Sequence, residues 1–226
     1  MNLSYRDEDG AELGALLWEL EPGWRAISSA MVGGGIGPVS WVLNAQVVAG
    51  YSRMDPVDHL LSLAPGGPGV GMMTAAYVSR YVEVDDEDVS VVATVGLRVP
   101  TWAAAPAGTA DPELRPMRVG TINIVAFLPV AMSDAALVNT VMTVTEAKCQ
   151  ALAEVGYPGT GTASDAVCVA VRAEGEPELF GGPRSVWGAR LARAVHRAVR
   201  QGADDWRRVA QRIDYEPLAR PIEPTP

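Results

Sequence analysis

Three nearly uninterrupted apolar runs constrain the fold of this 226-residue chain more than any other feature. They read VSVVATVGL at 89–97, VGTINIVAFLPV at 119–130 and AVCVAVRA at 166–173. Strands with apolar residues on both sides are buried on both faces, so each requires a covering layer above and below. The runs therefore predict mostly buried strands inside a layered α/β (or α+β) domain.

Further strands are predicted in the N-terminal quarter. Residues 13–20 and 24–32 are apolar runs joined by the turn EPG, which is a strand, turn, strand pattern. A third run, PVSWVLNAQVV at 38–48, is rich in β-branched residues. These segments add to the sheet content that the three central runs require.

Helices are predicted in three places. A short one begins at Asp55 and Pro56, and a mid-chain helix starts at the N-cap Ser133 and ends near Val155. A long amphipathic helix covers about 185–213, and we expect its Arg190, Arg193 and Arg197 to form a solvated outer face. We expect both long helices to pack on the strands. The pattern predicts one domain over 1–215 and a Pro-rich surface tail at 216–226.

Composition excludes several classes of protein. The net charge of −9 argues against a nucleic-acid partner, because neutralising phosphates needs basic residues. No apolar run reaches the roughly 20 residues of a membrane span, and the N-terminus does not resemble a signal peptide, so we expect a cytosolic protein. Cys149 and Cys168 are expected in the core, and His59 and His196 at the surface or at an edge.

The chain contains seventeen Arg and a single Lys, Lys148. On the mid-chain helix this Lys falls at the centre of the apolar face, whereas Asn139, Thr143, Glu146 and Gln150 share the opposite face. A buried ammonium must reach water, pair with a carboxylate or release its proton. Two interpretations stay open: a proton-transfer group, and an ion pair with an acid such as Asp165.

Glycines and hydroxyl residues gather at the ends of several predicted strands. Because sheets of α/β proteins bind ligands at strand ends, we expect these loops to form a binding site. The residues are Ser28, Ser29, Gly33, Gly34, Gly35, Thr74, Thr121, Asn123, Thr160, Thr162, Ser164 and Asp165, with Asn44 inside the run at 38–48.

Seven short motifs give this pattern a family resemblance. They are SSAMVGGG, WVLNAQV, GVGMMTAA, TVGL, GTINIV, TEAK and GTGTASDAV, in this order between about residues 27 and 172. Together they resemble the adenosylcobinamide amidohydrolase family of corrinoid salvage enzymes. Two departures are RVPTW after TVGL, where a small residue and an Asn are expected, and Ser164 in place of a Thr.

The resemblance implies hydrolysis of the amide between the corrin ring and the aminopropanol arm, giving adenosylcobyric acid for cobamide synthesis. Cobalt would belong to the corrinoid substrate, and we expect no cofactor or metal held by the protein. Amide hydrolysis needs an activated water or hydroxyl, an oxyanion stabiliser and a proton donor. Lys148, Glu146 and Asp165 are candidates for proton transfer, and Ser29 or Thr74 for the nucleophile.

The other strand-end residues, including Asn44, Asn123, Thr160 and Thr162, are candidates for substrate binding. Two other classes of function are compatible with the same loops. One is a corrinoid-binding or nucleotide-binding module without chemistry, and the other is a structural interaction domain. A homodimer is also possible. Release of aminopropanol from adenosylcobinamide would separate the enzyme from both alternatives.

Overall fold

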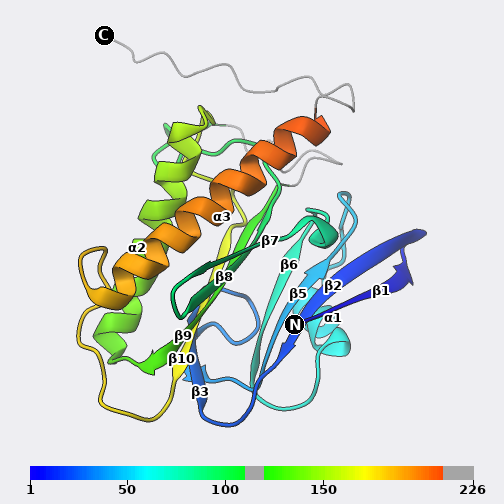
Figure 1. Ribbon diagram of the computed structural model, residues 1–226. Helices are drawn as coiled ribbons and strands as arrows, with labels where there is room; N and C mark the ends of the chain where they lie inside the picture. The colour runs from blue at the N-terminus through cyan, green and yellow to red at the C-terminus, as the bar shows by residue number, and fades with distance from the viewer. Residues whose placement is uncertain (110–119, 211–226) are drawn as a thin grey trace.

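Two β-sheets lie face to face, with two long helices outside one sheet and a short helix outside the other (Figure 1). The computed structural model describes residues 1–109 and 120–210. Its helices are α1 (Pro56–Leu63), η1 (Val78–Arg80), α2 (Asp134–Glu154) and α3 (Val186–Ala210). Its strands are β1 (Asn2–Glu8), β2 (Ala11–Glu19), β3 (Trp24–Ser28), β4 (Gly35–Pro38), β5 (Trp41–Gln46), β6 (Gly69–Thr74), β7 (Val82–Asp86), β8 (Val89–Val95), β9 (Ile122–Ala131) and β10 (Ala166–Arg172).

The larger sheet contains all three apolar runs. Its six strands follow the order β4-β3-β10-β9-β8-β7, so that β8, β9 and β10 are internal, as their composition predicts. On one face, α2 and α3 cover residues such as Ile124, Val169 and Leu128, which are fully buried. The other face packs against the smaller sheet through Val92, Val125 and other apolar residues. Burial on both faces explains why these strands are almost continuously apolar.

The smaller sheet has the order β1-β2-β5-β6, and α1 lies on its outer side. The runs predicted at 13–20 and 24–32 do form strands, but they enter different sheets. β2 pairs with β1 and β5, whereas β3 pairs with β4 and β10. The turn between β2 and β3 therefore carries the chain from one layer to the other. β1 was not predicted, because its side chains are exposed or half-buried and show no apolar alternation.

The predicted helices are present, and α1 and α2 end close to their expected residues. Ser133 caps α2 by accepting a hydrogen bond from the Ala136 amide at 3.2 Å. The layered α+β class, with a mid-chain helix and a long C-terminal helix on mostly buried strands, is therefore confirmed. The tail at 216–226 and the last residues predicted for the C-terminal helix lie outside the described residues.

The expectation about α3 was incomplete, and the one about α1 was wrong. Arg193 and Arg197 of α3 are exposed as predicted, but they also bind the carboxylate of Asp86, and Arg190 pairs with Glu87 and Asp88, so this face holds the β7–β8 turn. His59 of α1 was expected at the surface or at an edge, but only 2% of it is exposed. The helix is too short for periodicity to show that the tip of β1 and the segment after β5 cover this position.

The expectations for His196 and for the two cysteines agree better with the structure. His196 lies at an edge and contacts Glu154 Oε2 at 2.9 Å. Cys168 is fully buried, and burial raises the pKa of its thiol to about 12, while Cys149 is half-buried. Within residues 1–109 and 120–210, none of the helices combines the length and apolarity that crossing a bilayer requires.

The Asp86 carboxylate gives a prediction about acid stability. Two hydrogen bonds from Arg193, of 3.0 and 2.6 Å, lower the pKa of Asp86 in the folded state. A lowered pKa stabilises the fold above the ordinary Asp value of about 4, and this contribution is lost as the pH falls through the folded value. We expect Asp86→Asn to cost about 1 kcal/mol at pH 7, because both arginines are half exposed and partly screened.

Urea denaturation at a series of pH values would measure this difference, which should shrink as the pH is lowered towards 3. The control is Asp88→Asn, whose carboxylate is 70% exposed and lies 3.7 Å from Arg190. A difference between wild type and Asp86→Asn that stays constant across this pH range would contradict the assignment.

Candidate active site

A cleft of about 560 Å³ opens where the ends of strands from both sheets meet. Its walls come from the residues that follow β3, β5 and β6 and from those that precede β9 and β10. The lining residues are Ser29, Ala30, Met31, Val47, Val48, Tyr51, Arg53, Pro56, Met72, Met73, Thr74, Ala75, Thr121, Ser164, Asp165 and Ala166. A cleft of this size at strand ends, mostly apolar with a few polar groups, has the character of a small-molecule site.

Two hydroxyls in the lining have a proton available for a ligand. Ser29 Oγ accepts the amide of Val167 at 3.0 Å, and Thr74 Oγ1 accepts the amide of Ala76 at 3.0 Å. Neither hydroxyl donates a hydrogen bond to any other described residue. Since a hydroxyl carries one donor and two acceptor positions, each is oriented by the backbone and keeps its donor free. Each hydroxyl can therefore donate to an acceptor atom of a ligand.

A second pair of hydroxyls comes from the segments that precede β9 and β10. Thr121 Oγ1 and Ser164 Oγ are 2.8 Å apart, and Ser164 donates to the Gly120 carbonyl at 3.1 Å. The contact joins the start of β9 to the loop before β10. Together these two segments form a polar part of the cleft wall. Ser164 stands in the GTGTASDAV motif where a Thr was expected. Its hydroxyl makes the contact with Thr121 that a Thr hydroxyl could also make.

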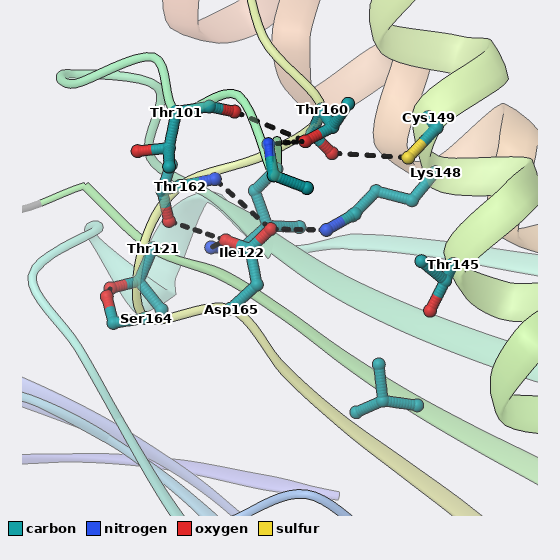
Figure 2. A network of polar contacts seen from close by, with 12 residues as sticks. Thr101, Thr121, Ile122, Thr145, Lys148, Cys149, Thr160, Thr162, Ser164 and Asp165 are labelled. Carbon is teal, nitrogen blue, oxygen red and sulfur yellow. Dashed lines mark hydrogen bonds and ion pairs between the residues drawn. The ribbon is translucent and has the colours of Figure 1, made fainter. Parts of the chain in front are cut away.

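Asp165 is the most heavily bonded group at the cleft, as Figure 2 shows. Its Oδ1 accepts the Ile122 amide at 2.9 Å and the Thr162 hydroxyl at 2.5 Å. Its Oδ2 accepts Lys148 Nζ at 2.5 Å and the Thr162 amide at 3.2 Å. A carboxylate offers about four lone-pair positions, and all four are used here. A further proton could therefore reach Asp165 only if one of these bonds were broken, and its predicted proton-transfer role stays a prediction.

Lys148 reaches this carboxylate from α2, behind the cleft wall (Figure 2). Its side chain is 11% exposed, as is that of Asp165. The ion pair that the helical pattern left open is therefore formed, although Lys148 itself does not line the cleft. The pairing resolves the cost of burying an ammonium on an apolar face. Any proton-transfer role for Lys148 would have to act through Asp165, and that role stays a prediction.

Gly161 makes room for the pair. A Cβ at this position would overlap Asp165 Oδ2 and would lie 2.6 Å from Lys148 Nζ. The loop is tied further by Thr160, whose amide donates to the Thr101 carbonyl at 2.9 Å, while Cys149 Sγ contacts the Thr160 carbonyl at 3.3 Å. The glycine and hydroxyl residues of this loop therefore hold the ion pair and the loop itself, and Thr160 and Thr162 do not line the cleft.

Asn44 and Asn123 lie beneath the cleft, between the two sheets. Asn123 Nδ2 donates to Asn44 Oδ1 and to the Met73 carbonyl, each at 2.8 Å, and Asn44 Nδ2 donates to Thr94 Oγ1 at 3.0 Å. The group links β5 and β6 of one sheet to β8 and β9 of the other. Asn123 Oδ1 is buried and has no hydrogen-bond partner among the described residues. Both asparagines thus support the floor of the site.

Several predicted site residues are placed elsewhere. Glu146 is exposed and lies in the groove between α2 and α3, on the far side of α2 from Asp165. Thr143, predicted on the same polar face, is buried and donates to the Gly181 carbonyl at 2.9 Å. Ser28 is buried and caps the Ala30 amide at 3.0 Å. The structure therefore brings Ser29, Thr74, Thr121 and Asp165 together and leaves Glu146 apart.

The triple-glycine loop makes a backbone contact rather than lining the cleft. Gly33 has φ +69°, and a Cβ there would overlap the Gly69 carbonyl. This close approach lets the chain after β3 run against β6, where the Gly71 amide donates to the Val32 carbonyl at 3.0 Å. Gly33 thus joins the two sheets at the edge of the site, whereas a Cβ at Gly34 would meet the Ala30 carbonyl and Gly35 pairs with Ser28 within the larger sheet.

Sequence reasoning missed Tyr51 and Arg53, which line the cleft from the segment between β5 and α1. That segment contains one glycine and one serine, Gly50 and Ser52, but not the repeated glycines and hydroxyls that identified the other loops. The only signal was its position after a strand. Among the described residues, no three His, Cys, Asp or Glu side chains are grouped in a way that could hold a metal ion.

Comparison with known proteins gives a consistent family. The family model for adenosylcobinamide amidohydrolase matches residues 2–211. A Halobacterium salinarum protein of that name is 40% identical over 118 residues, which cover 51% of this chain and half of that protein's length (50%). A Methanosarcina mazei protein of the same name is 25% identical over 194 residues, covering 80% of this chain and 90% of that protein. A crystallised Pyrococcus horikoshii OT3 protein, 14% identical, aligns with a TM-score of 0.41 over 86% of this chain and 77% of its own.

The buried ion pair predicts strong coupling between its partners. Lys148→Met leaves the Asp165 carboxylate without its counter-charge but with three other donors, so we expect a cost of about 3 kcal/mol in the free energy of unfolding. Adding Asp165→Asn should cost less than the sum of the single changes, with a coupling energy of about 1–2 kcal/mol. Urea denaturation of the four proteins measures this.

The matched control is Arg80→Met, which removes a surface pair with Asp205 and should cost less than about 1 kcal/mol. Strict additivity of Lys148→Met and Asp165→Asn would show that the two side chains act independently and would contradict the structural role assigned to the pair.

Proposed function

Because the chain belongs to the adenosylcobinamide amidohydrolase family, we propose that it hydrolyses the amide joining the corrin ring of adenosylcobinamide to its aminopropanol arm. The products are adenosylcobyric acid and aminopropanol, and the acid returns to cobamide synthesis. The cobalt of the reaction is carried by the substrate. The observation that carries this proposal is the pair of free hydroxyl donors, Ser29 and Thr74, in a cleft at the strand ends.

The free donors fit the charge that develops during amide hydrolysis. Attack on the carbonyl carbon moves negative charge to the oxygen, and preorganised donors stabilise that charge most when they need no rearrangement. Ser29 and Thr74 are already oriented by the Val167 and Ala76 amides. We assign them to the carbonyl oxygen of the scissile amide. This support is chemical and independent of the family match.

The cleft and its surroundings fit one edge of a large ligand. A corrinoid is larger than a cleft of about 560 Å³, so only the arm and the adjacent ring edge would enter it. Exposed apolar residues lie beside the opening or next to its lining residues: Met31 is 53% exposed, Met54 96% and Val57 42%. An exposed apolar group of this kind suits the apolar surface of a macrocycle.

Asp165 and Lys148 have a positioning role in this proposal. Their bonds hold the start of β9 and the loop before β10 so that Thr121 and Ser164 stay at the cleft. With all four acceptor positions of Asp165 occupied, proton transfer is left to another lining group. Glu146 faces the groove between the helices and is not part of the proposed chemistry.

The direct test is incubation of the protein with adenosylcobinamide. We expect stoichiometric aminopropanol and a corrinoid carboxylic acid, detected by liquid chromatography with mass spectrometry. A thermal shift accompanies binding, since a ligand at 100 times its dissociation constant adds about 2.7 kcal/mol of stability. Tight binding without aminopropanol would support the non-catalytic corrinoid-binding module. A protein that responds to neither corrinoids nor nucleotides would contradict both functions.

Ser29→Ala tests the role of the hydroxyl. Loss of one oxyanion donor lowers kcat by about 100-fold, with a much smaller effect on KM. Ser40→Ala is the matched control, because its hydroxyl donates to the Pro68 carbonyl outside the cleft lining. Unchanged kcat in Ser29→Ala would remove Ser29 from the site. If Ser29 were instead a covalent nucleophile, denaturing mass spectrometry during turnover would detect a corrinoid acyl adduct on the wild type.

A further inference from the structure

A chain of polar contacts leads from the cleft by way of α1 to the end of β1. It begins at Tyr51, which lines the cleft, and its phenolic oxygen lies 3.0 Å from His59 Nδ1. The two rings stack, with centroids 5.7 Å apart and planes inclined by 13°. His59 Nε2 in turn lies 2.7 Å from Glu8 Oε1. Three residues from three separate segments thus form a continuous chain of hydrogen-bonding atoms.

The direction of the protons in this chain follows from the chemistry of its last member. An ionised carboxylate can only accept, so the bond to Glu8 places a proton on His59 Nε2. In the neutral imidazole, Nδ1 is then an acceptor, and the phenol of Tyr51 donates to it. His59 is 2% exposed, so bulk water does not replace Tyr51 or Glu8 as the hydrogen-bond partner of either ring nitrogen. The Tyr51 oxygen keeps acceptor positions that can receive a proton from the cleft.

Glu8 is itself held in place. Arg6 Nε donates to Glu8 Oε2 at 2.6 Å, and Arg6 Nη2 donates to the Gln46 carbonyl at 2.8 Å. The tip of β1 is thereby fixed to the end of β5, next to the cleft. The side chain of Glu8 is 19% exposed and that of Arg6 20%. Arg6, Glu8, His59 and Tyr51 are thus linked in series, and this series of contacts ends at the proposed site of reaction.

We propose that Tyr51 is the proton-transfer residue of the cleft, with His59 and Glu8 as the positioning residues that exchange its proton. This inference rests on the proposed amide hydrolysis and supplies a proton-transfer group with free positions, whereas the four acceptor positions of Asp165 are occupied. Burial raises the pKa of Tyr51, so the phenol is protonated at neutral pH.

The proton balance closes without any outside reagent. Water attacks the amide carbon and passes one proton to Tyr51 Oη as the phenolic proton moves to His59 Nδ1, forming an imidazolium that Glu8 stabilises. When the carbon–nitrogen bond breaks, Tyr51 donates a proton to the departing amine nitrogen and recovers its own from His59. The products are the corrinoid carboxylic acid and aminopropanol, and the three side chains return to their starting state.

Tyr51→Phe is the main test, because it removes one oxygen and leaves the stacked ring on His59. We expect kcat for aminopropanol release to fall by about 100-fold or more, which is the usual contribution of general acid–base catalysis. The affinity for adenosylcobinamide, measured separately by equilibrium dialysis, should change by less than about 3-fold. Tyr5→Phe, on the exposed side of β1, is the matched control and keeps wild-type kcat.

Glu8→Gln tests the relay with a readout that a purely structural role would not move. Turnover requires a neutral His59, so the rate falls on the acid side of the pH–rate profile. Losing the carboxylate destabilises the imidazolium, and the acid limb therefore shifts to lower pH while the maximal kcat falls about 10-fold. Arg6, Arg53, Asp55 and Asp9 also lie around this group and are unchanged in the variant, so the shift reports on Glu8.

The outcomes separate the two proposals. An active wild type with a Tyr51→Phe variant at full kcat overturns the relay and leaves the proposed function intact. An acid limb that does not move in Glu8→Gln overturns the part assigned to His59 and Glu8. A wild type that binds adenosylcobinamide without releasing aminopropanol overturns the proposed function and the relay together.

Discussion

The carboxylate of Asp165 joins three segments of the chain: α2 through Lys148, the start of β9 through the Ile122 amide, and its own loop through Thr162. Desolvating these charges is costly, and full hydrogen bonding offsets that cost. The single Lys of the chain occupies this position, with its ammonium close to the Gly161 backbone. The wall of the cleft depends on this contact.

Support and chemistry are carried by different residues. The Lys148–Asp165 pair and the Asn44–Asn123 contact fix the segments at the junction of the two sheets. The groups with free positions towards a ligand are hydroxyls on the neighbouring strand ends and Tyr51. The saturated Asp165 carboxylate in the cleft wall holds the loops in place, so the lining groups do not have to reorganise when a ligand binds.

The sequence predicted the parts of the structure that depend on local pattern. Continuous apolar runs identified the internal strands β8, β9 and β10, and helical periodicity placed Lys148 on the buried face of α2. It could not show that β2 and β3 belong to different sheets, because pairing depends on long-range register. His59 was misplaced for a similar reason: its burial comes from β1 and the segment after β5, which no local pattern links to α1.

The most direct test of the account is a structure of the protein with adenosylcobinamide bound. We predict that the aminopropanol arm enters the cleft, with its amide carbonyl oxygen within hydrogen-bonding distance of Ser29 and Thr74, and that the bonds to Asp165 are unchanged. Binding of the corrinoid in the groove between α2 and α3, or with Asp165 released from Lys148 to contact the amide, would contradict it.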